Sequence, residues 1–191
     1  MKTKYLKFIT LSFIVINFIA CKAQTIYPFN TSSDKVPDYS YIKDTKNELP
    51  PYIGIYKANY QGNEIILYIT KTDKKLLEFP RKKFYKDVLE VRYIVKDSTG
   101  KVLQDTQNNI TKKNEIESII FNKRTDGALV FYYSGTNCSV GWGKINLKKI
   151  NATQLTWAYY RDSMLLMEGE CAGMDLKIYL PEVEGLVFTK Q

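Results

Sequence analysis

Short segments in which apolar and polar residues alternate follow one another along this chain, and turn-forming residues separate them. In residues 64–71, the side chains of Ile65, Leu67 and Ile69 fall on one face, which is the period of a half-buried β-strand. The short connection through Gly62 just before this segment is typical of a β-hairpin. The pattern predicts strands at 52–60, 64–71, 87–96, 101–105, 115–122, 128–134, 139–148, 154–161, 174–180 and 186–189.

No long segment has the 3.6-residue period of a helix, and Tyr, Phe, Val and Ile are frequent, so we expect an all-β domain. Sequential hairpins predict an antiparallel meander of about ten short strands. A meander must either close or protect its edges, which favours a lipocalin-like up-and-down barrel, with a β-sandwich as the second alternative. Residues 76–86 fit either a short helix or an irregular loop.

The first twenty residues have the organisation of an export signal. Three lysines precede an apolar run over residues 8–20, which is too short and too polar to span a bilayer. The run ends in Ala20 and Cys21, a small residue followed by cysteine, which resembles the lipobox of bacterial lipoproteins. We therefore expect residues 1–20 to be a lipoprotein signal peptide and Cys21 to carry a membrane-anchoring lipid. The alternatives are a plain secretory signal or an apolar helix with an incidental cysteine.

Residues 21–50 are expected to form the lipidated cysteine, a tether and an extended lead-in to a single β domain at 51–191. Four of the six prolines lie within or directly after this stretch, at positions 28, 37, 50 and 51, and proline disfavours a helix because it fixes φ and lacks an N–H. Apolar side chains such as Ile26, Phe29 and Ile42 predict that part of the lead-in packs on the domain. No acidic run follows Cys21, which favours a periplasm-facing protein, with the cell surface as the alternative location.

Two cysteines remain once Cys21 is assigned to the lipid. In an oxidising compartment, Cys138 and Cys171 are an even pair, and we predict a disulfide between them. Two buried free thiols are the alternative. A reactive cysteine nucleophile is disfavoured because no histidine is present to activate it.

The chain contains no histidine, which excludes Ser-His-Asp and Cys-His catalysis and histidine zinc sites. Carboxylate-based hydrolysis is the remaining enzymatic route. Loss of the three lysines of the signal lowers the formal net charge from +8 to +5, which suits solubility better than nucleic-acid binding. We predict no catalytic residues, no metal site, no cofactor and no nucleic-acid partner.

The 15 Tyr, 9 Phe and 2 Trp residues invite the interpretation that rings line a binding cavity inside the barrel. The alternative is that Tyr and Phe serve as strand formers, and that Trp142 and Trp157, on adjacent predicted strands, share a core contact. If the barrel encloses a cavity, its lining is expected among the inward-facing members of this set: Tyr68, Tyr93, Tyr132, Trp142, Trp157 and Tyr159.

Residues 80–86, with the sequence Pro-Arg-Lys-Lys-Phe-Tyr-Lys, interleave cations with aromatic rings. Such a stretch can bind anionic lipid headgroups. The favoured alternative is a solvated loop with Phe84 or Tyr85 packed into the core.

Several segments together are similar to an uncharacterised family of small flavobacterial lipoproteins, known only as a domain of unknown function. The segments are 21–25, 52–56, 137–143, 154–157, 180–181 and 186–190. The resemblance covers essentially the whole mature chain and implies export and a shared fold. It implies no activity, ligand or catalytic residue.

The sequence therefore leads to two functional hypotheses. The first is a lipid-anchored module of the cell envelope that binds a small apolar or amphipathic molecule. The second is an envelope protein that docks a partner protein without a ligand. An enzyme is the least favoured alternative and is not expected.

Overall fold

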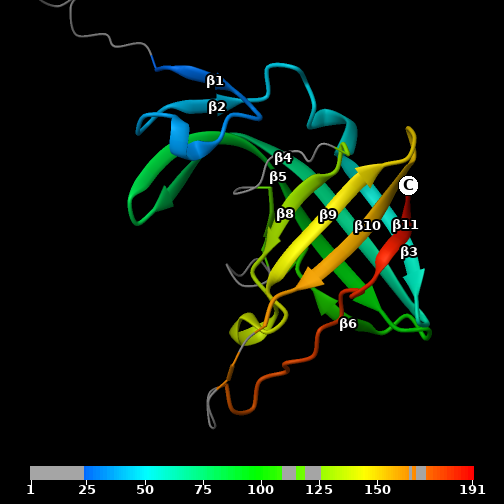
Figure 1. Ribbon diagram of the computed structural model, residues 1–191. Helices are drawn as coiled ribbons and strands as arrows, with labels where there is room; N and C mark the ends of the chain where they lie inside the picture. Colours follow the sequence, from blue (N-terminus) through cyan, green and yellow to red (C-terminus); the bar gives the residue numbers. More distant parts are fainter. Residues whose placement is uncertain (1–23, 109–114, 119–125, 164, 167–170) are drawn as a thin grey trace, which may run out of the picture.

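Eight antiparallel strands close into a barrel in the computed structural model, which describes residues 24–108, 115–118, 126–163, 165–166 and 171–191 (Figure 1). Each barrel strand pairs with the next one along the chain, and β3 pairs with β11 to close the ring. The strands are β3 (Gly54–Tyr60), β4 (Asn63–Phe79), β5 (Lys82–Lys96), β7 (Ile116–Glu117), β8 (Leu129–Tyr133), β9 (Gly143–Lys149), β10 (Gln154–Arg161) and β11 (Glu184–Lys190). This order confirms the predicted lipocalin-like, up-and-down barrel over a sandwich.

Side chains along each strand point alternately inward and outward, and the inward-facing ones fill the barrel interior. On β5, Leu89, Val91 and Tyr93 are fully buried inside, and on β10 Leu155 and Trp157 are buried in the same way. A barrel of about eight strands leaves an interior just wide enough for side chains to fill. Aromatic rings are in contact along this interior: Tyr93 with Tyr133, Tyr133 with Tyr159, Tyr159 with Trp157, and Trp157 with Phe188, at centroid distances of 5.7–6.5 Å.

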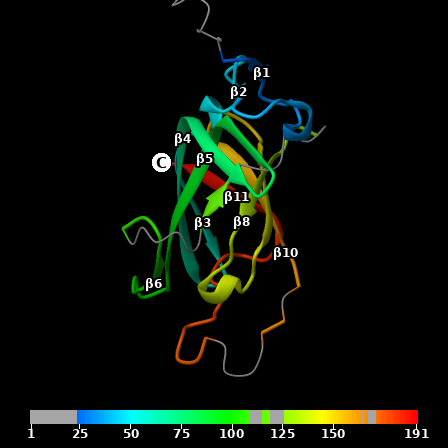
Figure 2. The ribbon, with the colours of Figure 1, turned by 90° about the vertical axis from the view of Figure 1, so that its left-hand side faces the viewer.

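Three short strands extend the sheet beyond the barrel: β1 (Ile26–Pro28), β2 (Tyr41–Lys43) and β6 (Val102–Asp105). β1 and β2 belong to the proline-containing lead-in; they pair in parallel with each other, and β2 pairs in parallel with β5. Figure 2 shows β1 and β2 at one end of the barrel, and β6 and the segment before β11 at the other. Three single 3-10 turns complete the described elements: η1 (Ser33–Lys35), η2 (Pro50–Tyr52) and η3 (Asn137–Ser139).

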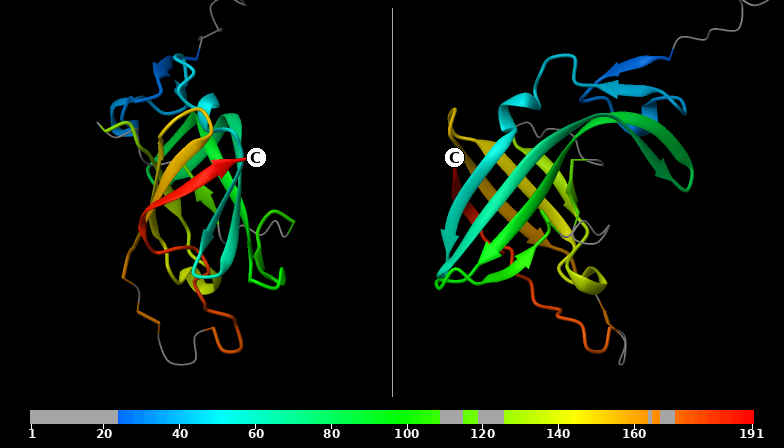
Figure 3. Two further views of the ribbon diagram at one scale, coloured as in Figure 1. Left: turned by 90° about the vertical axis from the view of Figure 1, so that its right-hand side faces the viewer. Right: turned by 180° about the vertical axis from the view of Figure 1, so that it is seen from behind.

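The β4–β5 hairpin runs past the barrel and bends away from it beside β1 and β2; we call this part, residues 75–86, the arm (Figure 3). The expectation of a helix or loop at 76–86 was wrong. Alternating apolar side chains make the arm two strands with a turn at residues 80–81, because one face is buried in a small core of its own. That core contains Val36, Ile42, Leu77 and Phe84, with Tyr27 and Phe79 packed against it.

Two further expected strands differ from the structure. Residues 174–180 form no strand: β11 occupies the one place between β10 and β3, so no ladder is left for this segment. Its apolar residues Ile178 and Leu180 pack on the end of the barrel core instead. The strand expected at 139–148 begins only at Gly143, because Cys138 and Ser139 have φ of 56° and 60° in a tight turn. Residues 119–122 of the strand expected at 115–122 lie outside the described residues, as do the signal peptide and Cys21.

The predicted disulfide is present. Cys138 and Cys171 are bonded, with their Cα atoms 6.4 Å apart. The bond joins the turn before β9 to the irregular segment that leads to β11, and so fixes that segment to the end of the barrel.

Candidate functional site

The six aromatic residues proposed as ligand-lining do not converge on one surface. Three of them, Tyr93, Trp157 and Tyr159, are buried in the barrel core. The other three, Tyr68, Tyr132 and Trp142, are half-buried and do not belong to that core.

Strand parity separates the two groups. Tyr68 lies between the inward-facing Leu67 and Ile69, and Tyr132 lies between the inward-facing Phe131 and Tyr133, so both rings face outward. Counting alternate residues along each strand would have shown this from the sequence.

The contact expected between Trp142 and Trp157 is also wrong. Trp142 precedes β9 and packs against Tyr132, with a centroid distance of 6.5 Å, whereas Trp157 packs inside the barrel.

The polar ends of four of the inner rings are used within the protein itself. The Trp157 indole N–H donates to the carbonyl of Pro181 at 2.9 Å, and the Tyr159 hydroxyl donates to the carbonyl of Gly141. The hydroxyls of Tyr93 and Tyr133 lie 3.2 Å apart, and burial raises the pKa of both groups. These rings therefore have the contacts of a structural core.

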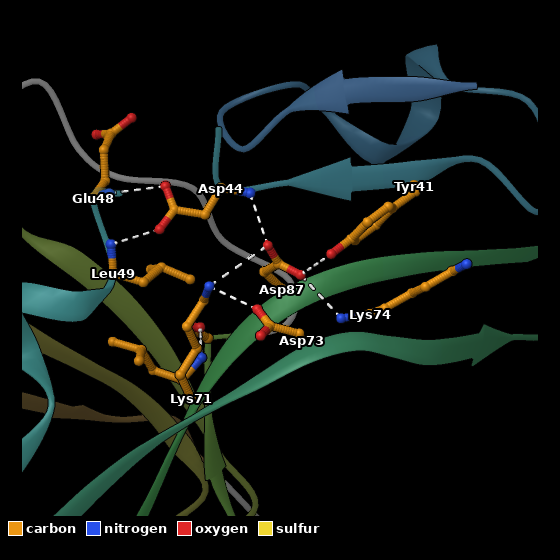
Figure 4. Close-up of polar contacts among 10 residues, drawn as sticks. Tyr41, Asp44, Glu48, Leu49, Lys71, Asp73, Lys74 and Asp87 are labelled. Atoms are coloured by element: carbon orange, nitrogen blue, oxygen red, sulfur yellow. Dashed lines mark hydrogen bonds and ion pairs between the residues drawn. The ribbon is translucent and has the colours of Figure 1, made fainter. Parts of the chain in front are cut away.

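A different cluster of polar groups joins the lead-in to the barrel (Figure 4). Asp87, 1% exposed at the base of the arm, accepts hydrogen bonds from the Tyr41 hydroxyl at 2.5 Å and from the backbone N–H of Asp44 at 2.9 Å. Asp44 is also buried and accepts the N–H groups of Glu48 and Leu49 at 2.8 and 2.9 Å. Two buried carboxylates thus fix residues 41–49 across the barrel end.

Asp87 also sets the position of a lysine. Its carboxylate accepts the backbone N–H of Lys74 at 2.9 Å, at a bulge where Lys74 has a φ of 53°. The ammonium group of Lys74 then lies 5.7 Å from the centroid of the Tyr41 ring and 5.4 Å from that of Tyr85. Figure 4 shows the Lys74 and Tyr41 side chains next to each other.

A second lysine offsets part of the charge of the buried carboxylates. Lys71 lies 3.8 Å from Asp87 and 2.6 Å from Asp73. Burial lowers the pKa of Lys71, but the hydrogen bond to Asp73 and the charge of Asp87 outweigh it, so the pKa is raised overall. The Tyr41 hydroxyl has a raised pKa because it is desolvated and donates to Asp87. The carboxylates of the cluster are therefore well hydrogen-bonded, and Lys71 compensates part of their charge.

A groove of about 520 Å³ opens beside this cluster. The walls come from the start of the described chain, from the segment before β2 and from the arm. The lining residues are Gln24, Thr25, Pro37, Asp38, Tyr39, Ser40, Lys74 and Tyr85. Main-chain pairing holds the groove together, because Tyr39 donates to the Lys83 carbonyl at 2.7 Å and Tyr85 donates to the Ser40 carbonyl at 2.8 Å.

A smaller pocket of about 360 Å³ lies at the other end of the barrel, among residues that include Gly141, Arg161 and Glu182. An ion pair between Arg161 and Glu182, with 3.3 Å between nitrogen and oxygen, spans part of it. This pocket lacks the rings that line the groove.

The lysines of the basic stretch at residues 80–86 are bonded to other residues or buried within the fold. Lys82 donates to the Val36 carbonyl, Lys83 pairs with Glu78 at 2.7 Å, and Lys86 is buried. Phe84 is buried in the small core of the arm, which agrees with the favoured alternative for this stretch.

An ion-pair cluster on the barrel wall has a structural explanation. Lys75 bridges Glu90 at 2.8 Å and Glu117 at 2.5 Å, and so joins β4, β5 and β7. The described pairing of β5 with β7 has only two residue pairs, so this bridge reinforces the closure of the barrel.

Sequence reasoning did not find Asp44, Asp87 or the groove. One signal was available: Asp87 has the same parity as Leu89 and Val91, so it is a carboxylate in an inward-facing position of a strand. Its partner Asp44 comes from a segment far away in the sequence, which no local pattern indicates.

Comparisons of the chain with known protein families, with curated proteins and with solved structures find no match. The resemblance to small flavobacterial lipoproteins therefore stays a prediction. Among the described residues, no three or more His, Cys, Asp or Glu side chains are grouped to hold a metal ion. The described part of the chain has no helix long and apolar enough to cross a membrane.

Proposed function

We propose that this chain is a lipid-anchored protein of the bacterial envelope that binds an amphipathic molecule in the groove between its lead-in and its arm. The observation that carries the proposal is the position of the groove: its first lining residue, Gln24, follows the predicted anchor residue Cys21 by three positions. In this proposal the ligand therefore binds at the end of the barrel nearest in sequence to the expected anchor, and not inside the barrel.

The composition of the groove supports this class of ligand. Tyr39 and Tyr85 offer ring faces to an apolar part, while Lys74 offers a positive charge to a polar or anionic part. The Lys74 side chain is already held in place by the rings of Tyr41 and Tyr85 and by its backbone bond to Asp87, which lowers the entropy cost of binding.

Mass spectrometry of the protein purified from bacterial membranes tests both parts of the proposal. Denatured protein should begin at Cys21 and carry the mass of a lipid on that residue; an unmodified Cys21 would refute the anchor. Native spectra should show an additional bound small molecule.

Variants of two tyrosines locate the binding site. Tyr39→Asn removes a ring that lines the groove and suits the φ of 61° at this position, because asparagine tolerates positive φ. We expect this variant to lose the bound mass. Tyr160→Asn, on the exposed side of β10, is the matched control and should keep it. Equal retention by both variants would refute the groove as the binding site.

Docking of an envelope protein is the second candidate, favoured by the outer edge of the arm. Beyond Ile69, which pairs with Gly54 of β3, β4 pairs only with β5. However, the bulge at Lys74 and the proline at position 80 shorten the stretch on which a partner strand can pair. Crosslinking in intact cells that captures one specific protein through the arm, with no ligand in the groove, would favour this candidate.

A further inference from the structure

One face of the sheet formed by β1, β2, β5 and β4 carries a row of apolar side chains in register, exposed at its two ends. Ile26 pairs with Tyr41, Tyr41 with Tyr85, and Tyr85 with Leu76, so these four side chains form a row across four strands. We call this side of the sheet, including the groove, the anchor face. Ile26 and Leu76, at the two ends of the row, are 54% and 41% exposed, and Tyr39 in the groove is 55% exposed.

Exposed cations accompany these apolar side chains. The ammonium groups of Lys43 and Lys74 lie 6.0 and 5.7 Å from the centroid of the Tyr41 ring. Neither lysine lies within ion-pair distance of a carboxylate in the described part of the chain. The acidic groups at this face are already near cations, since Glu78 pairs with Lys83 at 2.7 Å and Asp38 lies 3.9 Å from Lys82.

The position of the predicted lipid limits how far this face can lie from a membrane. Gln24 follows Cys21 by only three positions, and a fully extended chain spans at most about 3.5 Å per residue, or about 10 Å in all. An amphipathic surface of tyrosine, isoleucine, leucine and lysine within that reach has the composition of side chains at a membrane interface.

From the register, the free cations and the short tether, we infer that the anchor face docks on the anionic bilayer surface that holds the lipid of Cys21. Ile26, Tyr39 and Leu76 enter the boundary between headgroups and acyl chains, while Lys43 and Lys74 contact anionic headgroups. The amphipathic molecule in the groove is then a lipid of that bilayer. This inference rests on the proposed function, because it requires the lipid on Cys21.

Chemical labelling of lysines in the intact lipidated protein tests the docking. The protein is reconstituted into vesicles of phosphatidylcholine mixed with anionic phosphatidylglycerol, and separately into neutral detergent micelles. A water-soluble amine reagent is added, and mass spectrometry gives the labelling rate of each lysine. Lys177 is a matched control, because it is also exposed and lies 5.1 Å from a tyrosine ring, but at the opposite end of the barrel.

We expect the labelling rate of Lys74, divided by that of Lys177, to fall about five-fold from micelles to vesicles, which corresponds to about 1 kcal/mol for a lysine near an anionic surface. Protein molecules that face the vesicle interior are labelled at neither lysine, so they do not change this ratio. An equal ratio in micelles and vesicles would overturn the docking inference and leave the proposed function standing. If mass spectrometry of the membrane-purified protein finds no lipid on Cys21, the anchor is absent and the proposed function fails as well.

Two matched variants separate docking from other causes of protection. Leu76→Glu places a carboxylate on the anchor face, and we expect it to abolish the vesicle-dependent protection of Lys74. Val102→Glu makes the same change at an exposed position of β6, at the far end of the barrel, and should leave the protection unchanged. Persistence of the protection in Leu76→Glu would overturn the inference.

Discussion

Lys86 allows a test of the lead-in packing through the pH dependence of stability. Its side chain is 2% exposed, and its ammonium group lies 5.0 Å from the centroid of the Phe29 ring. Burial disfavours the charged form and lowers the pKa of Lys86 from 10.5 to about 8. The folded protein therefore keeps a cation buried at neutral pH at a cost in stability.

The cost follows from the difference between the two pKa values. A lowering from 10.5 to about 8 corresponds to about 3 kcal/mol, since one pKa unit is about 1.4 kcal/mol. Between these two pH values the unfolded chain binds more protons than the folded one, so the free energy of unfolding rises with pH. The full cost is present below about pH 8 and is gone above about pH 10.5.

Lys86→Met keeps the length of the side chain and removes its charge. We expect the free energy of unfolding of the variant, minus that of the wild type, to fall by about 3 kcal/mol between pH 7 and about pH 10.5, because only the wild type loses a buried charge over this range. Urea denaturation followed by tryptophan fluorescence at several pH values measures the difference. Tyrosine ionisation at high pH affects the variant and the wild type equally and therefore cancels in the difference. Lys43→Met, at an exposed position, is the control and should change little at any pH. A difference that does not depend on pH would refute a buried cation here.

Three further changes test the fold around the site. Asp87→Asn replaces an oxygen acceptor with an N–H donor in a buried site with several donors, and should destabilise the protein by about 2–4 kcal/mol and expose residues 41–49 to proteolysis; unchanged protease resistance would contradict this. The double variant Cys138→Ser, Cys171→Ser should lower the free energy of unfolding by about 3–4 kcal/mol, because the two cysteines are 33 positions apart in sequence; urea denaturation of both forms gives the difference, and equal stability would show that the bond is dispensable. Trp157→Ala should cost about 3–5 kcal/mol by leaving a cavity in the barrel core, measured as a lower midpoint of urea denaturation; a loss below about 1 kcal/mol would mean that the interior is loosely packed.

The barrel could be predicted from the sequence because the residue patterns that specify it lie in segments that are neighbours in the chain. Each hairpin brings together strands that are neighbours in the chain, and residues such as Leu67 and Tyr93 show their inward orientation through simple alternation. The disulfide was predictable for a related reason: with Cys21 set aside, Cys138 and Cys171 had no other partner.

The arm and the groove were not predictable in the same way. The arm turns at a proline and an arginine, without the glycine or asparagine that usually marks a hairpin, so the signal for two paired strands is weak there. The bulge at Lys74 places a lysine at positive φ, which propensity alone disfavours, and a side chain distant in sequence, Asp87, stabilises it. The contact of Asp87 with Asp44 depends on the lead-in folding back, which only the three-dimensional structure reveals.

The distribution of polar groups explains why binding is assigned to the arm and not to the barrel. Inside the barrel the rings of Tyr93, Trp157 and Tyr159 contact other rings or direct their polar atoms to main-chain carbonyls and hydroxyls of the protein, so a ligand would have to displace satisfied contacts. At the groove, by contrast, the buried carboxylate of Asp87 holds Lys74 in place while its ammonium group stays exposed. In the proposed function, the barrel is a rigid support, and the lead-in and arm added to one end supply the side chains that bind the ligand.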